Sequence, residues 1–481
     1  MAADIEVTTR GTAPWASAAT GLVCSGIALA ALHLALVCIS REFWYDRPLS
    51  EQPVLLLVAL QLAAGAVFLI SAWLIRRGTD SFSVLGWILL VGVVIRATMI
   101  GSSPMLEYDY YRYLWDGAVL AHGMNPFAHS PQAVIECAPS IPPELCKLGR
   151  DSGNVLARIS FPSLRTIYPF TAQLVFGLSH LISPWSTGAW KVTLAVFDIA
   201  ALGILLCALS DARLARSAIL VYWWNPLLVL TTYNAGHLDV ITLPLAVGAV
   251  LLALRQRPVS ASVVLAFAVC TKLWPIMLFP LILRSAWDRP RTVAAASILF
   301  FLTAGILMIP IYLAGIDEGS GFVAYARHWE MNAGLYRLLA EAVAYTVDLL
   351  SPGEAYVGTT VRWTVATVLA LWTLWLCRMN PGDPSKPWDR ALLIVAAGFL
   401  LSPTQFPWYY LWVIPFLVLS PRPSLLLLNC TLFLYYLVYY FRGIGEPELF
   451  DRYIPLLEYV PFWAVVAWEI LRSRRALHAR E

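Results

Sequence analysis

Charged residues are scarce in this sequence of 481 residues. Only 13% of them are Asp, Glu, Lys or Arg, whereas 59% are hydrophobic and the mean hydropathy is +0.69. A soluble domain carries about 25% charged residues. The composition therefore excludes an ordinary soluble protein and indicates a chain that crosses a membrane repeatedly. The formal net charge is only +3 and no basic stripe is present, which argues against a nucleic-acid partner.

Two other absences narrow the class. We expect no signal peptide, because the first residues lack a basic region and no small-residue cleavage site follows the apolar run 16–39. No internal repeat is evident. This weighs against a secondary transporter, since many transporters are built from repeats.

Apolar segments suited to crossing a bilayer recur along the whole chain. We expect an all-α polytopic membrane protein with about twelve transmembrane helices in a single domain, 1–481. The predicted crossings are 16–40, 53–75, 83–101, 190–208, 216–235, 237–254, 292–314, 358–377, 391–404, 406–420, 423–441 and 456–471.

Two further apolar segments are predicted not to cross. Residues 259–283 carry Lys272 near their middle and have basic residues beyond both ends, so we expect a re-entrant hairpin. Residues 167–183 are expected to be re-entrant or to lie along the surface. With these assignments the basic clusters all fall on one side, which the positive-inside rule makes cytoplasmic. The outer side then receives the large loop 102–189, with its juxtamembrane helices, and the loop 315–357.

The start of the first large loop, "EYDYYRYLWD" at 107–116, is unusually polar. On a helix, Asp109, Arg112 and Asp116 share one face. One interpretation is a surface helix whose charges simply meet water. The alternative is a site: a carboxylate directly after a spanning helix reaches a substrate in the outer leaflet and can act as a general base toward a hydroxyl.

Two other polar motifs reach the outer side. His237 and Asp239, in "NAGHLD", suit an anion or a sugar hydroxyl, although Asp near a helix start is favourable in any case. No third and fourth metal ligand accompanies them. Lys272 in the apolar hairpin costs about 2.5–3.5 kcal/mol on insertion scales, which favours a functional role with a partner.

The remaining motifs lie in the second half of the chain. "YARHWEMNAGLYRLL" at 325–339 offers His328 and Arg337 as phosphate ligands, or is a solvated amphipathic helix. "LSPTQFPWYYLW" at 401–412 offers Gln405, Trp408 and Tyr409 as pocket residues, or as part of an aromatic belt.

Two of the eight cysteines, Cys137 and Cys146, flank "APSIPPEL" in the large polar loop. The pair is a possible disulfide if this loop lies outside the cytoplasm, and otherwise two free thiols.

Taken in order, these motifs resemble a known family. "DYYRYLWDG" followed by "GMNPF", then "YPFTAQ", "WWNP…NAGHLD", "TKLWP", "HWEMNAGLY" and "SPTQFPWYYLW" is similar to integral-membrane glycosyltransferases with the GT-C fold. More narrowly, the set resembles bacterial and archaeal polyprenyl-phosphate-mannose-dependent mannosyltransferases. The resemblance covers roughly residues 84–420.

The resemblance implies a mechanism in the inner membrane of a prokaryote, with the active site on the outer face. A polyprenyl-phosphate-linked sugar, with mannose expected, is the donor, and a glycan, lipid or protein is the acceptor. Asp109, in an Asp-x-x-Arg-Tyr pattern with Arg112 and Tyr113, is the implied base of an inverting transfer. Lys272, His237 and Arg337 are the candidates to stabilise the leaving phosphate. Tyr168, Trp408 and Tyr409 are expected to line the groove, and no metal cofactor is expected.

The sequence also departs from the family pattern. Phe406 stands where relatives often have His, and Phe170 replaces the second Pro of a Tyr-Pro-Pro motif. Three helices, rather than one, precede the large loop, which predicts a divergent subfamily. Two other functions are considered: a transporter or flippase of lipid-linked glycans, and a ligase. A flippase needs polar groups on both faces, whereas these motifs gather on one face.

Overall fold

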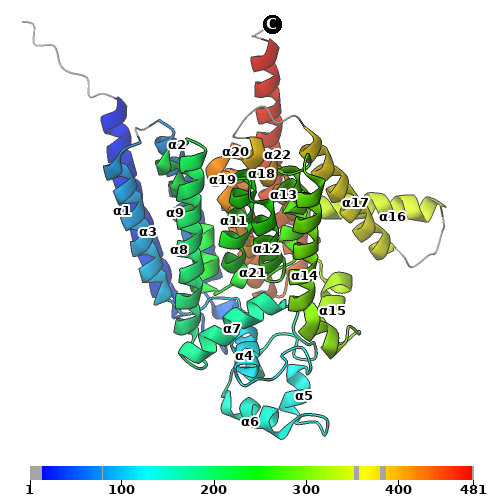
Figure 1. Cartoon of the computed structure of the whole chain (residues 1–481). Coiled ribbons are helices and arrows are strands. Elements are labelled where there is room, and N and C mark those ends of the chain that lie inside the picture. The colour runs from blue at the N-terminus through cyan, green and yellow to red at the C-terminus, as the bar shows by residue number, and fades with distance from the viewer. Residues whose placement is uncertain (1–13, 78–79, 351–356, 380–385, 479–481) are drawn as a thin grey trace, which may run out of the picture.

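The computed structural model describes residues 14–77, 80–350, 357–379 and 386–478. These residues form helices and connecting loops, and no β-strand occurs among them. Most helices stand side by side in a bundle, and the C-terminal end of α22 (Pro447–His478) projects beyond one end of this bundle (Figure 1). The predicted all-helical polytopic membrane fold is therefore confirmed.

Eight helical segments are long and apolar enough to cross a membrane among the described residues. At 1.5 Å per residue, even the shortest, of 19 residues, extends about 28 Å, close to the hydrocarbon thickness of a bilayer. They are α1 (Pro14–Ser40), α2 (Val54–Ile75), α3 (Phe82–Ile100), α8 (Thr187–Asp211), α14 (Pro290–Ala314), α17 (Val357–Arg378), the succession α20 (Pro423–Thr431), η8 (Leu432–Tyr436) and α21 (Leu437–Gly443), and α22.

The other four predicted crossings are shorter and broken. Pro226 interrupts the first of them, 216–235. There the Asn225 side chain accepts hydrogen bonds from the Leu227 and Leu228 amides and starts a new helical turn. The segments Pro226–Asn234 and Leu238–Leu254 meet at a bend of 108°. The elements concerned are η3 (Arg216–Ile219), α9 (Leu220–Trp223), α10 (Pro226–Val229), η4 (Leu230–Asn234), η5 (Leu238–Ile241), α11 (Thr242–Leu254), α18 (Lys386–Leu400), η7 (Pro407–Trp412) and α19 (Ile414–Leu419).

The arm that follows this bend is fixed along the length of α8. At one end of α8, Asp211 pairs with Arg255 (2.7 Å), the residue that follows α11. Near the other end, Trp190 donates to the carbonyl of Gly236 (2.7 Å), at the bend. Trp190 and Asp211 are separated by about 32 Å of helix. The arm from Gly236 to Arg255 therefore extends across the same thickness as α8.

A buried ion pair fixes α3 to these central elements. Arg96 of α3 bonds Asp198 of α8 (Nε to Oδ2, 2.6 Å), and Asp198 also accepts from the hydroxyls of Tyr222 and Tyr233. Both charged side chains are almost fully buried. A charge inside a bundle is tolerated when it is paired and hydrogen-bonded, so this network locks the three N-terminal helices to the core.

The predicted re-entrant hairpin is present. It consists of α12 (Pro258–Val269), η6 (Trp274–Leu278) and α13 (Phe279–Arg284). Its two ends meet, because Arg289 donates to the side chain of Gln256 (3.0 Å). Lys272 lies at the tip between the arms, as predicted.

The long loops gather at the end of the bundle away from the C-terminal end of α22 (Figure 1). The helix α7, which covers most of 167–183, lies outside the bundle against α4, as expected for a surface segment. Gly117 of α4 permits this contact, because a Cβ there would lie 2.4 Å from the carbonyl oxygen of Phe176. These elements are η1 (Leu49–Glu51), α4 (Tyr110–Ala121), α5 (Pro131–Ile135), α6 (Pro143–Asp151), η2 (Leu156–Arg158), α7 (Phe170–Ile182) and α15 (Gly321–His328). The helix α16 (Gly334–Leu350) projects sideways from the bundle beside α17 (Figure 1).

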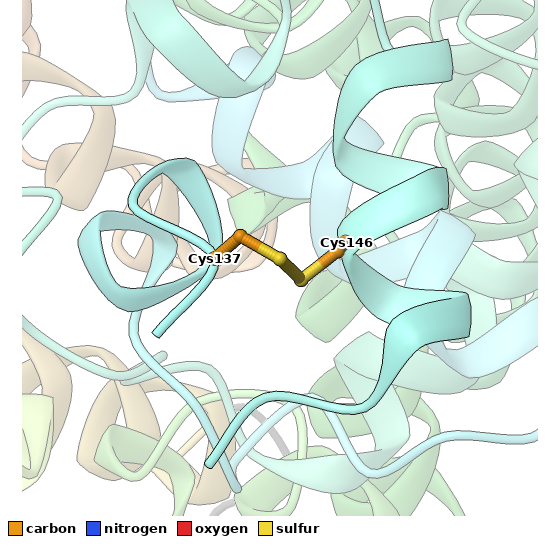
Figure 2. The surroundings of a disulfide bond; sticks show 2 residues. All are labelled: Cys137 and Cys146. Carbon is orange, nitrogen blue, oxygen red and sulfur yellow. A yellow bond between two sulfur atoms is a disulfide. The ribbon is translucent and has the colours of Figure 1, made fainter. Parts of the chain in front are cut away.

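A disulfide joins two of these elements. Cys137, just after α5, is bonded to Cys146 of α6, with a Cα–Cα distance of 5.6 Å (Figure 2). The bond closes a short loop and belongs to the same end of the molecule as α4 and α7.

Candidate active site

A cavity of about 870 Å³ opens at the loop end of the bundle. This volume lies in the upper part of the range of ligand sites, about 300–1,000 Å³. Its walls come from segments far apart in the sequence: the loop after α1, the start of α4, the segment 160–169, the hairpin tip, α15, η7 and the end of α21.

Asp109 immediately precedes α4 and lines this cavity. The segment between α3 and α4 is held in place by Asn234, which accepts from the Met105 amide and donates to the Ser102 hydroxyl and the Ser103 carbonyl. Lys191 donates to the Ser102 carbonyl as well (2.7 Å). Four buried hydrogen bonds therefore fix the chain a few residues before Asp109.

The Asp109 carboxyl group lies deep in the protein, yet 35% of its side chain remains exposed, toward the cavity. Burial raises the pKa of this carboxyl above its ordinary value, while the charges of Lys272 and Arg112 oppose the rise. The Tyr168 hydroxyl donates to Oδ2 at 3.5 Å, a long hydrogen bond, whereas His237 Nδ1 at 3.8 Å is too far for one. A weakly hydrogen-bonded carboxylate with a raised pKa is suited to accept a proton.

Lys272 has the partner that a charge in this position needs. Its ammonium donates to Asp239 Oδ1 (2.6 Å), which also accepts from the Trp412 indole (2.7 Å). The same ammonium lies 3.8 Å from the centre of the Tyr409 ring. All four residues line the cavity, so the ammonium of Lys272 can also meet a ligand there.

Arg112 lines the cavity and Asp116 lies behind its wall. Arg112 donates to the carbonyls of Phe161 and Leu164 (both 3.1 Å), so it ties the segment 160–164 to α4. Asp116 accepts from the Gln173 amide (3.2 Å). Burial raises the pKa of Asp116 to about 6, against the opposing effects of Arg112, Thr166 and Gln173. This carboxyl group does not line the cavity.

The structure brings together most of the residues selected from the sequence. Those that line the cavity are Asp109, Arg112, Tyr113, Tyr168, Asp239, Lys272, Trp408 and Tyr409. Two others support its wall from behind. His237 is fully buried and stacks on Trp408 at 4.0 Å, and Gln405 is held inside its own turn by a hydrogen bond to the Leu400 carbonyl.

The structure does not bring His328 and Arg337 to the cavity. His328 is exposed at the end of α15, and Arg337 pairs with Glu341 on the surface of α16 (3.2 Å). Phe406 lines the cavity and stacks on Trp408 at 4.4 Å, so it extends the aromatic wall.

Sequence reasoning missed a second group of lining residues. These are Tyr45, Arg47 and Gln52 in the loop after α1, Glu107 and Tyr108 before α4, Tyr325 of α15 and Trp329 just after it, and Tyr439 and Arg442 of α21. Glu107 opens the polar motif 107–116, but the sequence analysis assigned it no role in the site. Only the fold brings Tyr439 to Glu107, because 332 residues separate them.

Among the described residues, no group of three or more His, Cys, Asp or Glu side chains is placed to hold a metal ion. Asp109, Asp239 and His237 come near one another, but Asp239 is already occupied by Lys272 and Trp412. That the reaction needs no metal stays a prediction.

Comparison with known proteins indicates the reaction class. Residues 166–403 match glycosyltransferase family 87, and residues 16–144 match the N-terminal domain of alpha-(1->6)-mannopyranosyltransferases. The chain is also 20% identical over 456 residues to alpha-(1->6)-mannopyranosyltransferase A of Corynebacterium glutamicum, covering 85% of this chain and 87% of the relative. No solved structure gives a significant match. The predicted resemblance to membrane glycosyltransferases is confirmed, and glycosyl transfer is the reaction class that these matches support.

Proposed function

We propose that this protein transfers a mannosyl residue from a polyprenyl-phosphate donor to an acceptor hydroxyl, with inversion at the anomeric carbon and with Asp109 as the general base. The observation that carries the proposal is the position of Asp109. Asp109 lines the cavity, and its carboxyl group has a single hydrogen bond among the described residues, the long one from Tyr168.

The lipid chain of such a donor needs an apolar route into the cavity. Leu273 of the hairpin and Phe161 line the cavity and are 48% and 59% exposed. Phe161 packs against Trp329 at 4.7 Å. These residues supply an apolar mouth beside Lys272 through which an isoprenoid chain can remain in the bilayer.

In the proposed step Asp109 takes the proton of the acceptor hydroxyl while that oxygen forms a bond to the anomeric carbon. The bond between this carbon and the phosphate oxygen breaks, and polyprenyl phosphate leaves with the electron pair. Lys272, beside the apolar mouth, is the cation that stabilises the negative charge developing on the phosphate. Tyr168, Trp408 and Tyr409 provide aromatic walls around the sugar.

The proposed site faces the outside of the cell. Basic residues mark the opposite end of the bundle, where Arg284 donates to the Cys377 carbonyl and Arg390 to the Met379 carbonyl. The positive-inside rule makes that end cytoplasmic. The disulfide at the cavity end agrees, since disulfides persist outside the cytoplasm. We therefore propose the cytoplasmic membrane of a prokaryote as the location.

The test uses purified full-length protein in nanodiscs, polyprenyl-phosphate-[¹⁴C]mannose and a membrane extract as the source of acceptor. We expect the wild type to form a labelled product whose linkage is inverted relative to the donor. Asp109→Asn should form about 10²–10⁴-fold less product, because general base catalysis contributes that much. Asp151→Asn, at the exposed end of α6, is the matched control and should behave as wild type.

Three results would contradict the proposal. Undiminished transfer by Asp109→Asn would exclude this residue as the base. A retained anomeric configuration would exclude direct displacement. Label that changes leaflet without entering a product would indicate a flippase.

A further inference from the structure

The cavity has two polar ends, on either side of Asp109. One, the lysine end, consists of Asp239, Lys272, Tyr409 and Trp412 and adjoins the apolar mouth. The other, the arginine end, consists of Tyr45, Gln52, Glu107, Tyr439 and Arg442. At the lysine end, Lys272 and Asp239 act on the charge of Asp109. Asp109 in turn acts on Glu107, whose other partners are Tyr439 and Arg442 of the arginine end. Asp109 therefore lies between the two ends.

The arginine end contains polar groups that the protein does not satisfy. Gln52 is 6% exposed, and its amide donates to the Arg47 carbonyl (2.7 Å), but its Oε1 has no hydrogen-bond partner among the described residues. A buried amide oxygen without a partner is unfavourable, so a ligand that donates a hydrogen bond to it is stabilised. Arg442 lines the same end of the cavity, and its exposed guanidinium has no hydrogen bond or ion pair with any described residue.

The chemistry of this end suits a neutral polyhydroxyl compound. Burial raises the pKa of Glu107 well above its usual range, which favours the protonated carboxyl group, and a protonated carboxyl group both donates and accepts hydrogen bonds. Tyr439 donates to its Oε1 (2.8 Å). Arg47, the other cation nearby, is neutralised by Glu42 and lies near Glu51. Arg442 therefore remains the one cation of this end without an ion pair among the described residues, and its guanidinium can donate to sugar hydroxyls.

An aromatic platform borders these groups. Tyr45 is 37% exposed and packs edge-on against Tyr108, with ring centres 4.9 Å apart. Arg158 packs against this platform: its guanidinium lies 4.5 Å from the Tyr45 ring centre and donates to the Tyr111 hydroxyl. An exposed aromatic face beside hydroxyl, amide and guanidinium groups offers both an apolar surface and the hydrogen bonds that a sugar ring needs.

We propose that the arginine end is the acceptor subsite and that it binds a neutral sugar, whose hydroxyl it presents to Asp109 from the side opposite the lipid-linked donor. This inference rests on the proposed function, because it assigns the second substrate of the same site. It places the acceptor in contact with the loop after α1, outside the part of the chain that matches glycosyltransferase family 87.

The experiment measures KM for octyl α-D-mannopyranoside and for polyprenyl-phosphate-mannose separately. Arg442→Gln and Glu107→Ala should each raise KM for the mannoside about ten-fold or more, with KM for the donor unchanged within two-fold. Glu107→Gln should stay close to wild type, because an amide also donates and accepts. Arg452→Gln, on the exposed surface of α22, is the control and should change neither constant.

Two outcomes would overturn the inference. Variants that raise KM for the donor instead would make the arginine end a phosphate site, and variants that change neither KM would show that no substrate binds there. If the wild type transfers no mannose, the proposed function fails by itself. The subsite is then tested by saturation-transfer NMR of the mannoside on wild type and Arg442→Gln, and a signal that is absent from wild type or equal in both overturns it.

Discussion

The pair formed by Lys272 and Asp239 permits one prediction that separates folding from catalysis. Asp239 is 1% exposed and Lys272 only 18%, so replacing Lys272 by Met leaves a buried carboxylate whose remaining donor is the Trp412 indole. Removing one partner of a buried ion pair costs about 3–5 kcal/mol of stability. Lys272→Met should therefore lower the melting temperature strongly, and transfer should fall about 10²–10³-fold if the lysine also stabilises the leaving phosphate.

The double variant Lys272→Met/Asp239→Asn distinguishes the two effects. Removing both charges restores most of the stability, because an uncompensated charge is no longer buried. The lost cation is not restored, so transfer should stay about 10²-fold or more below wild type. The assay is a thermal melt in detergent beside the rate of label transfer at saturating donor. A double variant with wild-type activity would show that Lys272 serves only to neutralise Asp239, and would refute its proposed role toward phosphate.

Three further predictions follow from the same geometry. First, the pKa of Asp116 is raised from 3.8 to about 6, so between these values the native protein holds a proton that the unfolded protein has lost, and stability falls as pH rises from about 4 to about 6. Wild type should lose about 3 kcal/mol of stability over this window that Asp116→Asn does not lose, and equal pH slopes of the two melting temperatures would contradict the prediction. Second, Gly117→Ala places a Cβ 2.4 Å from the Phe176 carbonyl oxygen and should lower the stability by about 1–3 kcal/mol, because it separates α4 from α7. The control Gly203→Ala, with open space around it, should be neutral or slightly stabilising, and similar melting temperatures for both variants would refute the close contact. Third, EDTA should leave the transfer rate unchanged, and a loss that Mg²⁺ or Mn²⁺ restores would reveal a metal requirement.

The fold could be predicted from the sequence because its signals are local. Apolar length and flanking arginines identify the spans and the hairpin that contains Lys272. The same reasoning overestimated the regularity of the spans: Pro226 and the bend near Gly236 break the central arms into short helices, and their neighbours satisfy the interrupted backbone.

The site was predictable only in part, because proximity in sequence does not fix the direction of a side chain. His328 and Arg337 share a motif with Tyr325, yet only Tyr325 faces the cavity, hydrogen-bonded to Tyr409 (3.1 Å). The arginine end went unrecognised because its members come from the loop after α1, the start of α4 and α21. No local pattern joins such residues, and their role follows only from the packed structure.

The central claim is that the Asp109 carboxylate removes the proton of the acceptor. The most direct measurement is kcat of Asp109→Asn at saturating donor and acceptor, relative to wild type in the same nanodiscs. The account predicts a fall of at least about 10²-fold with the donor KM little changed, since the isosteric amide keeps the shape of the cavity but cannot take the proton. A kcat within a few-fold of wild type would contradict it.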